Sequence, residues 1–292
     1  MLFTRFAPSP TGYLHRGHLL SALFVFAAAD LFSAKVRLRI EDHDKSRARK
    51  EYIDSIPEDL ERFGFKFESL SLQSNRQALY EKYAQLLFSK QKLYPCSCSR
   101  KKLFEENPVN ADGEVIYSGH CLKNPIDKNS DFALRFKTPD KTITWEDLLL
   151  GKFEENPKNQ CGDFTIKDRI SQWTYQFAVC VDDLEENIGL VVRGEDLRNS
   201  TARQIALLEA LGKKTPPLYL HHPLLTEKSG EKLSKRQHSK SLRAELEQGL
   251  SIEDLLGLVC YEAHSIPKRA PLTLNEAISS IQKTYFSCFL KK

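Results

Sequence analysis

Two histidines stand three residues apart in the segment RFAPSPTGYLHRGH, residues 5–18, directly after a loop rich in proline and glycine. We predict that a helix begins here, so that His15 and His18 face the same way. The backbone N–H groups of a helix N-terminus attract phosphate, and two imidazoles beside them can donate to a triphosphate. Gly12 and Gly17 would let such a ligand approach the backbone closely. A structural loop before a core helix is the competing interpretation, but the preceding Pro-Ser-Pro-Thr-Gly favours a binding site.

A second cationic feature is the segment EKLSKRQ at residues 231–237. Lys232 and Lys235 lie three apart with Ser234 between them, and lysine is a suitable point charge for phosphate. By itself such a segment is more often an exposed basic turn. Only the fold can unite it with the histidines near the start of the chain.

The third group is a cysteine-rich stretch that runs from CSC at residues 96–98 to YSGHC at residues 117–121. Its three thiols, with a phenol or an imidazole, offer the four ligands that tetrahedral Zn²⁺ requires. His120 is the better fourth ligand on general chemistry, and Tyr117 is the alternative. The chain has seven cysteines, and an odd number argues against a disulfide framework. Unliganded cysteines in a loop are the competing interpretation.

Composition excludes several classes of protein. The 292 residues are 41% hydrophobic and 28% charged, which is ordinary for a globular protein with a sizeable core. The start of the chain shows no secretory signal, and the longest apolar run, residues 19–29, is too short to span a bilayer. We therefore expect a cytoplasmic protein with no membrane partner. The sequence does not indicate an oligomeric state, and a monomer is the default expectation. The net charge of +4 is too small to indicate a nucleic-acid partner by itself, although the basic residues cluster as a polyanion-binding face would require.

The elements that must position these groups follow an α/β pattern. We expect a strand at residues 2–6, a helix at about 17–33 and a strand at 35–42 that ends in acids. This order opens a parallel sheet, whose ligands gather at the carboxyl ends of the strands. Glu41 and the histidine loop are both expected at that edge. Further helices are expected near 56–63, 76–90, 200–212, 251–263 and 273–290, strands at 188–197 and 216–225, and helical periodicity near Trp145 to Leu150.

Changes in composition divide the chain into four parts. Residues 94–163 are polar and irregular, and we interpret them as an insertion that carries the zinc site. The first and second halves of a nucleotide-binding catalytic fold flank it at 1–93 and 164–240, the latter with the lysine segment. Residues 241–292 form a short helical C-terminal region.

Taken together, HRGH at 15–18 and KLSKR at 232–236 resemble the paired signatures of the class I aminoacyl-tRNA synthetases, usually written HIGH and KMSKS. RFAPSPTGYLHRGH, RIED and VVRGEDL resemble the glutamyl branch of that class, over roughly residues 3–240. The resemblance implies a Rossmann-like parallel sheet with a zinc-containing insertion. Arg16 and Arg236 depart from the signatures, at positions where the family tolerates variation.

The resemblance implies activation of L-glutamate by ATP with Mg²⁺. The substrate carboxylate is already ionised and attacks the α-phosphate in line, so catalysis consists of positioning and of stabilising phosphate charge. The implied catalytic residues are His15, His18, Lys232 and Lys235. The implied ATP-binding residues are Pro10, Thr11, Gly12, His15, Gly17, His18, Ser234 and Lys235.

Glutamate carries two carboxylates and one ammonium group. Arg5 and Arg193 can each pair with a carboxylate, and Glu41 can take the ammonium. A surface ion pair is the competing interpretation for Arg193 and Glu41. By resemblance, the pocket is lined by Arg5, Phe6, Ala7, Pro8, Ser9, Glu41, Tyr175 and Arg193. Val179 stands where glutamyl-tRNA synthetases often carry an asparagine.

For the metal, the resemblance favours Tyr117 over His120. The implied ligands of one structural Zn²⁺ per chain are Cys96, Cys98, Tyr117 and Cys121. Such an ion would pin an insertion that has little apolar core of its own.

Little of the chain follows Arg236, and we expect no separate anticodon-binding domain there. In this the chain resembles the short glutamyl-Q tRNA(Asp) synthetase family, which transfers glutamate to the queuosine base of tRNA(Asp). An anticodon loop entering the cleft would be read by shape and splayed bases. The alternatives are a short glutamyl-tRNA synthetase that charges the 3′ end of tRNA(Glu), a small-molecule adenylyltransferase and a catalytically inactive RNA-binding module.

Overall fold

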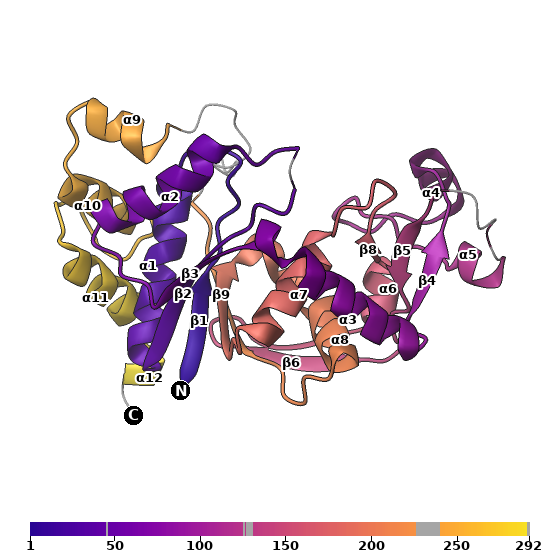
Figure 1. Ribbon diagram of the computed structural model, residues 1–292. Coiled ribbons are helices and arrows are strands. Elements are labelled where there is room, and N and C mark those ends of the chain that lie inside the picture. The colour runs from indigo at the N-terminus through magenta and orange to yellow at the C-terminus, as the bar shows by residue number, and fades with distance from the viewer. Residues whose placement is uncertain (45, 125, 127–130, 226–239, 291–292) are drawn as a thin grey trace.

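The computed structural model describes residues 1–44, 46–124, 126, 131–225 and 240–290. Its elements form an elongated α/β molecule with the first strands and the last helices at one end and the cysteine-bearing part at the other (Figure 1). None of the helices in these ranges is long and apolar enough to cross a membrane.

The first sheet is parallel and holds the strands expected near the start of the chain. Its order is β1-β2-β3, with Leu2 opposite Ala34 and Arg37 opposite Ser69. Helix α1 (Arg16–Leu31) connects the first two strands and is buried along most of its length. The strand bounds are Leu2–Phe6 for β1, Ala34–Ile40 for β2 and Ser69–Leu72 for β3.

The second sheet has the order β7-β6-β10-β9, in which β6, β10 and β9 run parallel and β7 is antiparallel. The sheets meet where the Gly189 amide donates to the Phe3 carbonyl at 3.0 Å, beside β1 and β9. Chain order reverses at this junction, which is where open α/β sheets bind their ligands. The bounds are Ile143–Asp147 for β6, Gly151–Glu155 for β7, Leu190–Gly194 for β9 and Leu218–His222 for β10.

The helical periodicity expected near Trp145 to Leu150 was wrong. Residues 143–147 alternate buried and exposed side chains, which is the period of a strand, and they form a hairpin with β7. Trp145 stacks on Phe153 across this hairpin, with ring centroids 4.6 Å apart. The hairpin therefore extends the second sheet.

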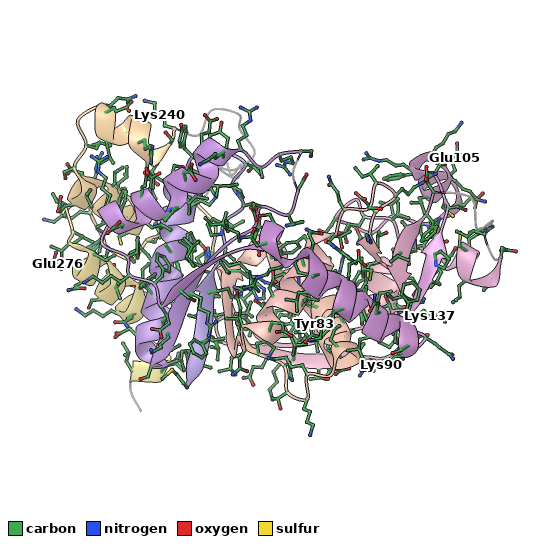
Figure 2. The ribbon with its side chains drawn as sticks, viewed as in Figure 1. Tyr83, Lys90, Glu105, Lys137, Lys240 and Glu276 are labelled. Atoms are coloured by element: carbon green, nitrogen blue, oxygen red, sulfur yellow. The ribbon has the colours of Figure 1, made fainter. Side chains whose placement is uncertain are left out.

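Helices cover both sheets and build two separate cores. One core surrounds α1 and includes the C-terminal helices, and the other lies around α7 and α8. Helix α3 runs across α7 and α8, where the Tyr83 hydroxyl donates to Glu185 and Lys90 Nζ donates to the Ala210 carbonyl at 2.8 Å (Figure 2). The helices are α2 (Lys50–Arg62), α3 (Gln77–Ser89), α7 (Tyr175–Glu185), α8 (Thr201–Leu211), α9 (Leu242–Glu247), α10 (Ile252–Glu262), α11 (Leu274–Tyr285) and α12 (Ser287–Leu290), with 3-10 turns at Gln73–Arg76 and Glu195–Ser200.

The cysteine-bearing part has a small antiparallel sheet of its own, in the order β4-β5-β8. We use the name cysteine lobe for residues 93–123, which contain β4, α4 and α5. Five buried side chains form its core: Tyr94, Cys96, Cys98, Tyr117 and Cys121. The elements are β4 (Leu93–Cys96), α4 (Arg100–Glu106), α5 (His120–Lys123), β5 (Ala133–Phe136), α6 (Pro157–Cys161) and β8 (Thr165–Lys167).

Candidate active site

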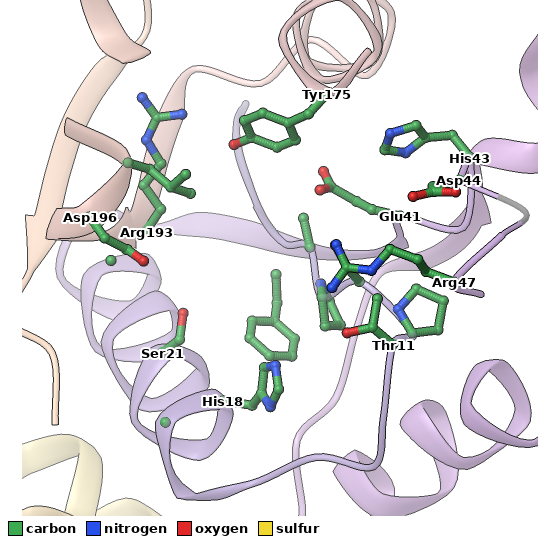
Figure 3. A pocket seen from close by; sticks show the side chains of 18 of the residues that line it. Thr11, His18, Ser21, Glu41, His43, Asp44, Arg47, Tyr175, Arg193 and Asp196 are labelled. Atoms are coloured by element: carbon green, nitrogen blue, oxygen red, sulfur yellow. The ribbon is translucent and has the colours of Figure 1, made fainter. Parts of the chain in front are cut away.

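A pocket of about 730 Å³ opens at the carboxyl ends of β1 and β9, where the two sheets meet (Figure 3). Most of the residues expected to bind substrates line it: Arg5, Phe6, Ala7, Pro8, Ser9, Pro10, Thr11, His15, Gly17, His18, Glu41, Tyr175 and Arg193. Gly12 is not among the lining residues. Lys232, Ser234, Lys235 and Arg236 lie outside the described residues.

The two histidines cap the start of α1 with their ring nitrogens. His15 Nδ1 accepts the Gly17 amide at 3.1 Å, and His18 Nδ1 accepts the His15 amide at 3.2 Å. In a neutral ring whose Nδ1 accepts, the proton lies on Nε2. Within the described part of the chain, each imidazole thus has one N–H donor left for a ligand. A side chain at Gly17 would be 2.9 Å from His15 Cε1, so glycine leaves room for the ring.

Burial keeps both rings uncharged. It lowers the pKa of His15, with help from Arg16, and it lowers the pKa of His18 to about 3, with help from His15. At neutral pH the pair therefore offers N–H donors rather than positive charges.

Arg5 is held by a buried ion-pair cluster below the pocket. Its Nε donates to Asp183 Oδ1 at 3.0 Å, and Nη2 of the fully buried Arg39 lies 2.8 Å from the same oxygen. Burial alone would raise the pKa of Asp183, but the two guanidinium groups hold it below its usual value. Arg39 Nη1 also donates to Glu186 at 3.0 Å. The position of Arg5 is thus fixed before any ligand arrives.

Glu41 directly follows β2 and lines the pocket with Tyr175 and Arg193, and Arg193 lies across the pocket from it (Figure 3). Its amide donates to the Pro8 carbonyl at 3.0 Å, which ties the proline loop to β2. Burial raises the pKa of Glu41 to about 7, in spite of Arg39, whose Nη2 lies 3.6 Å away, and Arg5.

Arg193 is anchored differently from Arg5. Its three hydrogen bonds end on uncharged groups: His221 Nε2 at 3.0 Å, Gln204 Oε1 at 2.7 Å and Thr201 Oγ1 at 2.9 Å. Arg193 and Glu41 are only 5% and 6% exposed, so the surface ion pair considered for them was wrong.

Both ends of the segment that bears the lysines lie at the cleft. Leu225, before it, lines the pocket, and Ser241, after it, forms a β-bridge with His15. The Leu242 amide also donates to the Leu14 carbonyl at 2.8 Å. Arg16, the unusual residue between the histidines, pairs with Glu262 of α10 and, at 3.4 Å, with Glu245 of α9. It thereby joins the histidine helix to the C-terminal helices.

In the cysteine lobe the three thiols converge, with all Sγ atoms within 4.8 Å of one another. Cys98 and Cys121 Sγ are 3.4 Å apart, and Tyr117 Oη lies 3.4 Å from Cys96 Sγ and 3.5 Å from Cys98 Sγ. Such spacings suit atoms that share one tetrahedral ion. Burial opposes ionisation of Cys121, but hydrogen bonds from Tyr117 and Cys98 lower its pKa to about 7. The Cys121 thiolate is therefore accessible near neutral pH, whereas burial raises the pKa of the Cys98 thiol to about 11.

His120 does not join this cluster. Its Nε2 lies 3.3 Å from Lys102 Nζ, and it is not part of the three-thiol group. The geometry thus places the phenol of Tyr117, rather than the imidazole, beside the thiols. Within the described ranges these cysteines are the one group of three or more His, Cys, Asp or Glu side chains with convergent ligand atoms.

Sequence reasoning missed the residues that hold the site from behind. Arg39 and Asp183 anchor Arg5, and Gln204 and His221 anchor Arg193. The pairs Asp182–Asp183 and His221–His222, each at the end of an apolar run, were the available signals. Val179, where an asparagine was expected, is buried in the core around α7 and does not line the pocket.

Comparisons with known proteins point in one direction. Residues 1–268 match the family described as tRNA synthetases class I (E and Q), catalytic domain. Glutamyl-Q tRNA(Asp) synthetase of Neisseria meningitidis serogroup C (strain 053442) is 39% identical over 242 residues, which cover 82% of this chain and 81% of that protein. Glutamate–tRNA ligase of Aquifex aeolicus (strain VF5) is 37% identical over 91% of this chain, which spans only 58% of the ligase. The crystal structure of glutamate-tRNA synthetase from Elizabethkingia anophelis gives a TM-score of 0.76 at 26% identity, covering 95% of this chain and 65% of that one.

Proposed function

The chain belongs to the class I tRNA synthetases of the E and Q branch, and we propose that it activates glutamate with ATP and transfers it to the queuosine base of tRNA(Asp). The observation that carries the proposal is the composition of the cleft. Two neutral imidazoles, whose Nε2–H groups have no partner among the described residues, line the cleft together with Arg5, Arg193 and Glu41.

His15 and His18 bind the triphosphate at the N-terminus of α1. Their N–H groups and the helix dipole stabilise the negative charge that spreads over the α-phosphate as pyrophosphate leaves. Lys232 and Lys235 act on the same phosphates, since both flanks of their segment lie at the cleft. Mg²⁺ is held mainly by the nucleotide phosphates in such reactions and neutralises part of their charge.

In the same cleft, Arg5 and Arg193 take the two carboxylates of glutamate and Glu41 takes its ammonium group. The Tyr175 hydroxyl and Ser9 complete the pocket with hydrogen bonds. One carboxylate of glutamate attacks the α-phosphate, the bond to pyrophosphate breaks, and glutamyl-adenylate forms. No group of the chain needs to accept a proton in this step because the attacking carboxylate is already ionised.

The acceptor in the second step is a hydroxyl of the cyclopentene-diol of queuosine, which attacks the acyl carbon and releases AMP. The name of the Neisseria relative, which this chain matches over 81% of its length, supports queuosine as the acceptor. The similarity to the Aquifex ligase favours a second candidate, transfer to the 3′ end of tRNA(Glu).

We further propose that the cysteine lobe holds one structural Zn²⁺ on Cys96, Cys98, Tyr117 and Cys121. The convergent thiols and the adjoining phenol provide four donors of the types that zinc accepts. The ion would supply folding free energy to the lobe and take no part in the reaction.

Glutamate-dependent exchange of labelled pyrophosphate into ATP tests the activation step. We expect exchange with L-glutamate, and at least about a hundredfold less with glutamine, which leaves one arginine without a carboxylate. Exchange driven by another acid, with none by glutamate, would contradict the proposal and favour a small-molecule adenylyltransferase. Absence of all exchange would favour an inactive RNA-binding module.

A further inference from the structure

Behind Arg193 lies a buried polar relay that the proposed chemistry does not use. His221 Nε2 accepts from Arg193 Nε at 3.0 Å, and His221 Nδ1 lies 2.6 Å from Asp147 Oδ2. His221 is fully buried, and Asp147 is 2% exposed. The relay therefore joins three strands, because Arg193 is on β9, His221 on β10 and Asp147 on β6.

Asp147 is saturated with donors. Its Oδ2 accepts the His221 amide at 3.0 Å in addition to the ring, and its Oδ1 accepts the amides of Leu149 and Leu150 at 2.9 and 3.0 Å. The three amides always donate, so both oxygens of Asp147 must accept, and a carboxylate has no hydrogen to offer the ring of His221. Asparagine, which has one oxygen and one NH₂ group, cannot accept at both positions.

The acceptor oxygens of Asp147 determine the tautomer of His221. Because Asp147 Oδ2 accepts a hydrogen bond from His221 Nδ1, the ring proton lies on Nδ1 and the Nε2 lone pair faces Arg193. Burial lowers the pKa of His221, in spite of Asp147, so the ring stays neutral. A proton on Nε2 would instead point at the Nε–H of the guanidinium and push it away.

A second chain of hydrogen bonds holds the remaining part of the Arg193 guanidinium in the same manner. Gln204 Oε1 accepts from Arg193, its NH₂ group donates to Gln176 Oε1 at 2.8 Å, and Gln176 donates to Ser200 Oγ at 2.9 Å. Both chains of hydrogen bonds thus offer uncharged acceptors to Arg193, and neither brings a carboxylate into contact with it. Arg5, in contrast, contacts the carboxylate of Asp183 directly.

We propose that Asp147 and His221 are positioning residues that orient Arg193 for a substrate carboxylate while leaving its positive charge available. A carboxylate in direct contact would hold the guanidinium equally firmly, but it would compete with the substrate for the same N–H groups. Moving the negative charge one imidazole away avoids this competition. The inference rests on the proposed function, in which Arg193 binds a carboxylate of glutamate.

The test compares Michaelis constants in ATP–pyrophosphate exchange. For Asp147→Asn we expect the KM for glutamate to rise about tenfold or more, since a buried hydrogen bond to a charged group is lost, while the KM for ATP stays within about twofold. Nitrogen NMR of the histidine rings provides an independent readout. His221 should give the signals of the Nδ1–H tautomer in the wild type and lose them in the variant.

Substitutions of His221 cover the case in which Asp147→Asn fails to fold. The oxygen and nitrogen of a glutamine amide are spaced much like the two ring nitrogens, so His221→Gln can accept from Arg193 and donate to Asp147. We expect it to keep the KM for glutamate within about threefold of the wild type, whereas His221→Leu, of similar size but without an acceptor, should raise it about tenfold.

Asp59→Asn is the matched control. Asp59 is 5% exposed and accepts from Arg243 Nε at 2.6 Å, but it does not line the cleft. This variant should lower the melting temperature and leave the KM for glutamate unchanged.

Two results would overturn the inference, for different reasons. Wild-type exchange with an unchanged KM for glutamate in Asp147→Asn and His221→Leu would show that the relay only stabilises the fold. A wild type without glutamate-dependent exchange would overturn the proposed function, and the inference with it.

Discussion

The cleft and the cysteine lobe reach a defined shape by different means. The cleft stands between two large cores, and its functional side chains are held by partners far away in the sequence, such as Asp183 behind Arg5. The lobe has five core side chains, of which three are thiols that lie within a short stretch of chain. The cleft is thus organised by buried hydrogen bonds and ion pairs, whereas the lobe has too little apolar surface to fold on that basis.

This difference implies that the cleft and the cysteine lobe are each disrupted by a different kind of change. Removing a metal should disrupt the lobe and spare the cleft. Removing a single buried charge or N–H donor should disrupt the cleft and spare the lobe.

Metal removal is expected to have the largest effect. Structural zinc contributes roughly 10 kcal/mol or more to small metal-dependent folds, so Cys121→Ser should abolish zinc retention and open residues 93–123 to proteases. Glutamate-dependent exchange should stay within about threefold of the wild type. Metal analysis, limited proteolysis and exchange assays measure these outcomes.

Cys161→Ser is the control, since Cys161 is also buried but its Sγ contacts the Pro157 carbonyl at 3.1 Å and lies outside the thiol cluster. It should retain one zinc per chain. Exchange that collapses together with zinc in Cys121→Ser would show that the two regions are not independent.

The variant Asp183→Asn removes a negative charge from the buried ion-pair cluster below the cleft. It leaves the buried Arg39 and Arg5 without a shared carboxylate, and breaking a buried pair costs about 3–5 kcal/mol. Urea unfolding should show a loss of this size, with zinc still bound to the lobe. A loss below about 1 kcal/mol would contradict the role we assign to the cluster.

Two substitutions of His18 separate capping from catalysis. In His18→Asn the amide oxygen can replace Nδ1 as the acceptor of the His15 amide, but the Nε2–H donor is gone. We expect the kcat of exchange to fall about 10²–10³-fold, as for other removed donors to a transition-state charge. His18→Gln, whose NH₂ group reaches the position of Nε2, should retain more activity. Equal activity in the two variants would mean that the donor does not act on the phosphates.

The smallest effect concerns pH. Glu41 has a pKa of about 7 and must be ionised to pair with an ammonium group. The contribution of this ion pair to glutamate binding is therefore present above pH 7 and is lost below it. Lowering the pH from 8 to 6 should raise the KM for glutamate up to about tenfold. In Glu41→Gln the KM should be high and no longer change across this range. A wild-type KM for glutamate that decreases as the pH is lowered would contradict this role of Glu41.

The sequence predicted the parts of the molecule that local patterns encode. The strand–loop–helix–strand start is confirmed because periodicity reveals it. The pocket residues that the family resemblance implied lie together in one cleft, and the three cysteines expected as metal ligands converge. The anchors of the two arginines could not be predicted in this way. Asp183 meets Arg5, and His221 meets Arg193, only after distant strands and helices pack, and a buried acid looks like a surface acid in a sequence.

The hairpin of β6 and β7 shows the same limit in secondary structure. Five residues with alternating burial are too few to distinguish a strand from a helical turn by periodicity, and pairing with β10 decides the outcome. In the lobe, the sequence left the phenol of Tyr117 and the imidazole of His120 as alternatives. The structure places the phenol beside the thiols.

The most direct test of the proposed function is transfer of labelled glutamate to two tRNA pools, one from cells that make queuosine and one from cells that do not. Blocking the 3′ ends by removal of the terminal adenosine, which leaves the queuosine diol intact, separates the two acceptor sites. We predict label only on the queuosine-containing pool and full labelling when the 3′ ends are blocked. Label on both pools that disappears when the 3′ ends are blocked would contradict the account and identify charging of tRNA ends as the activity.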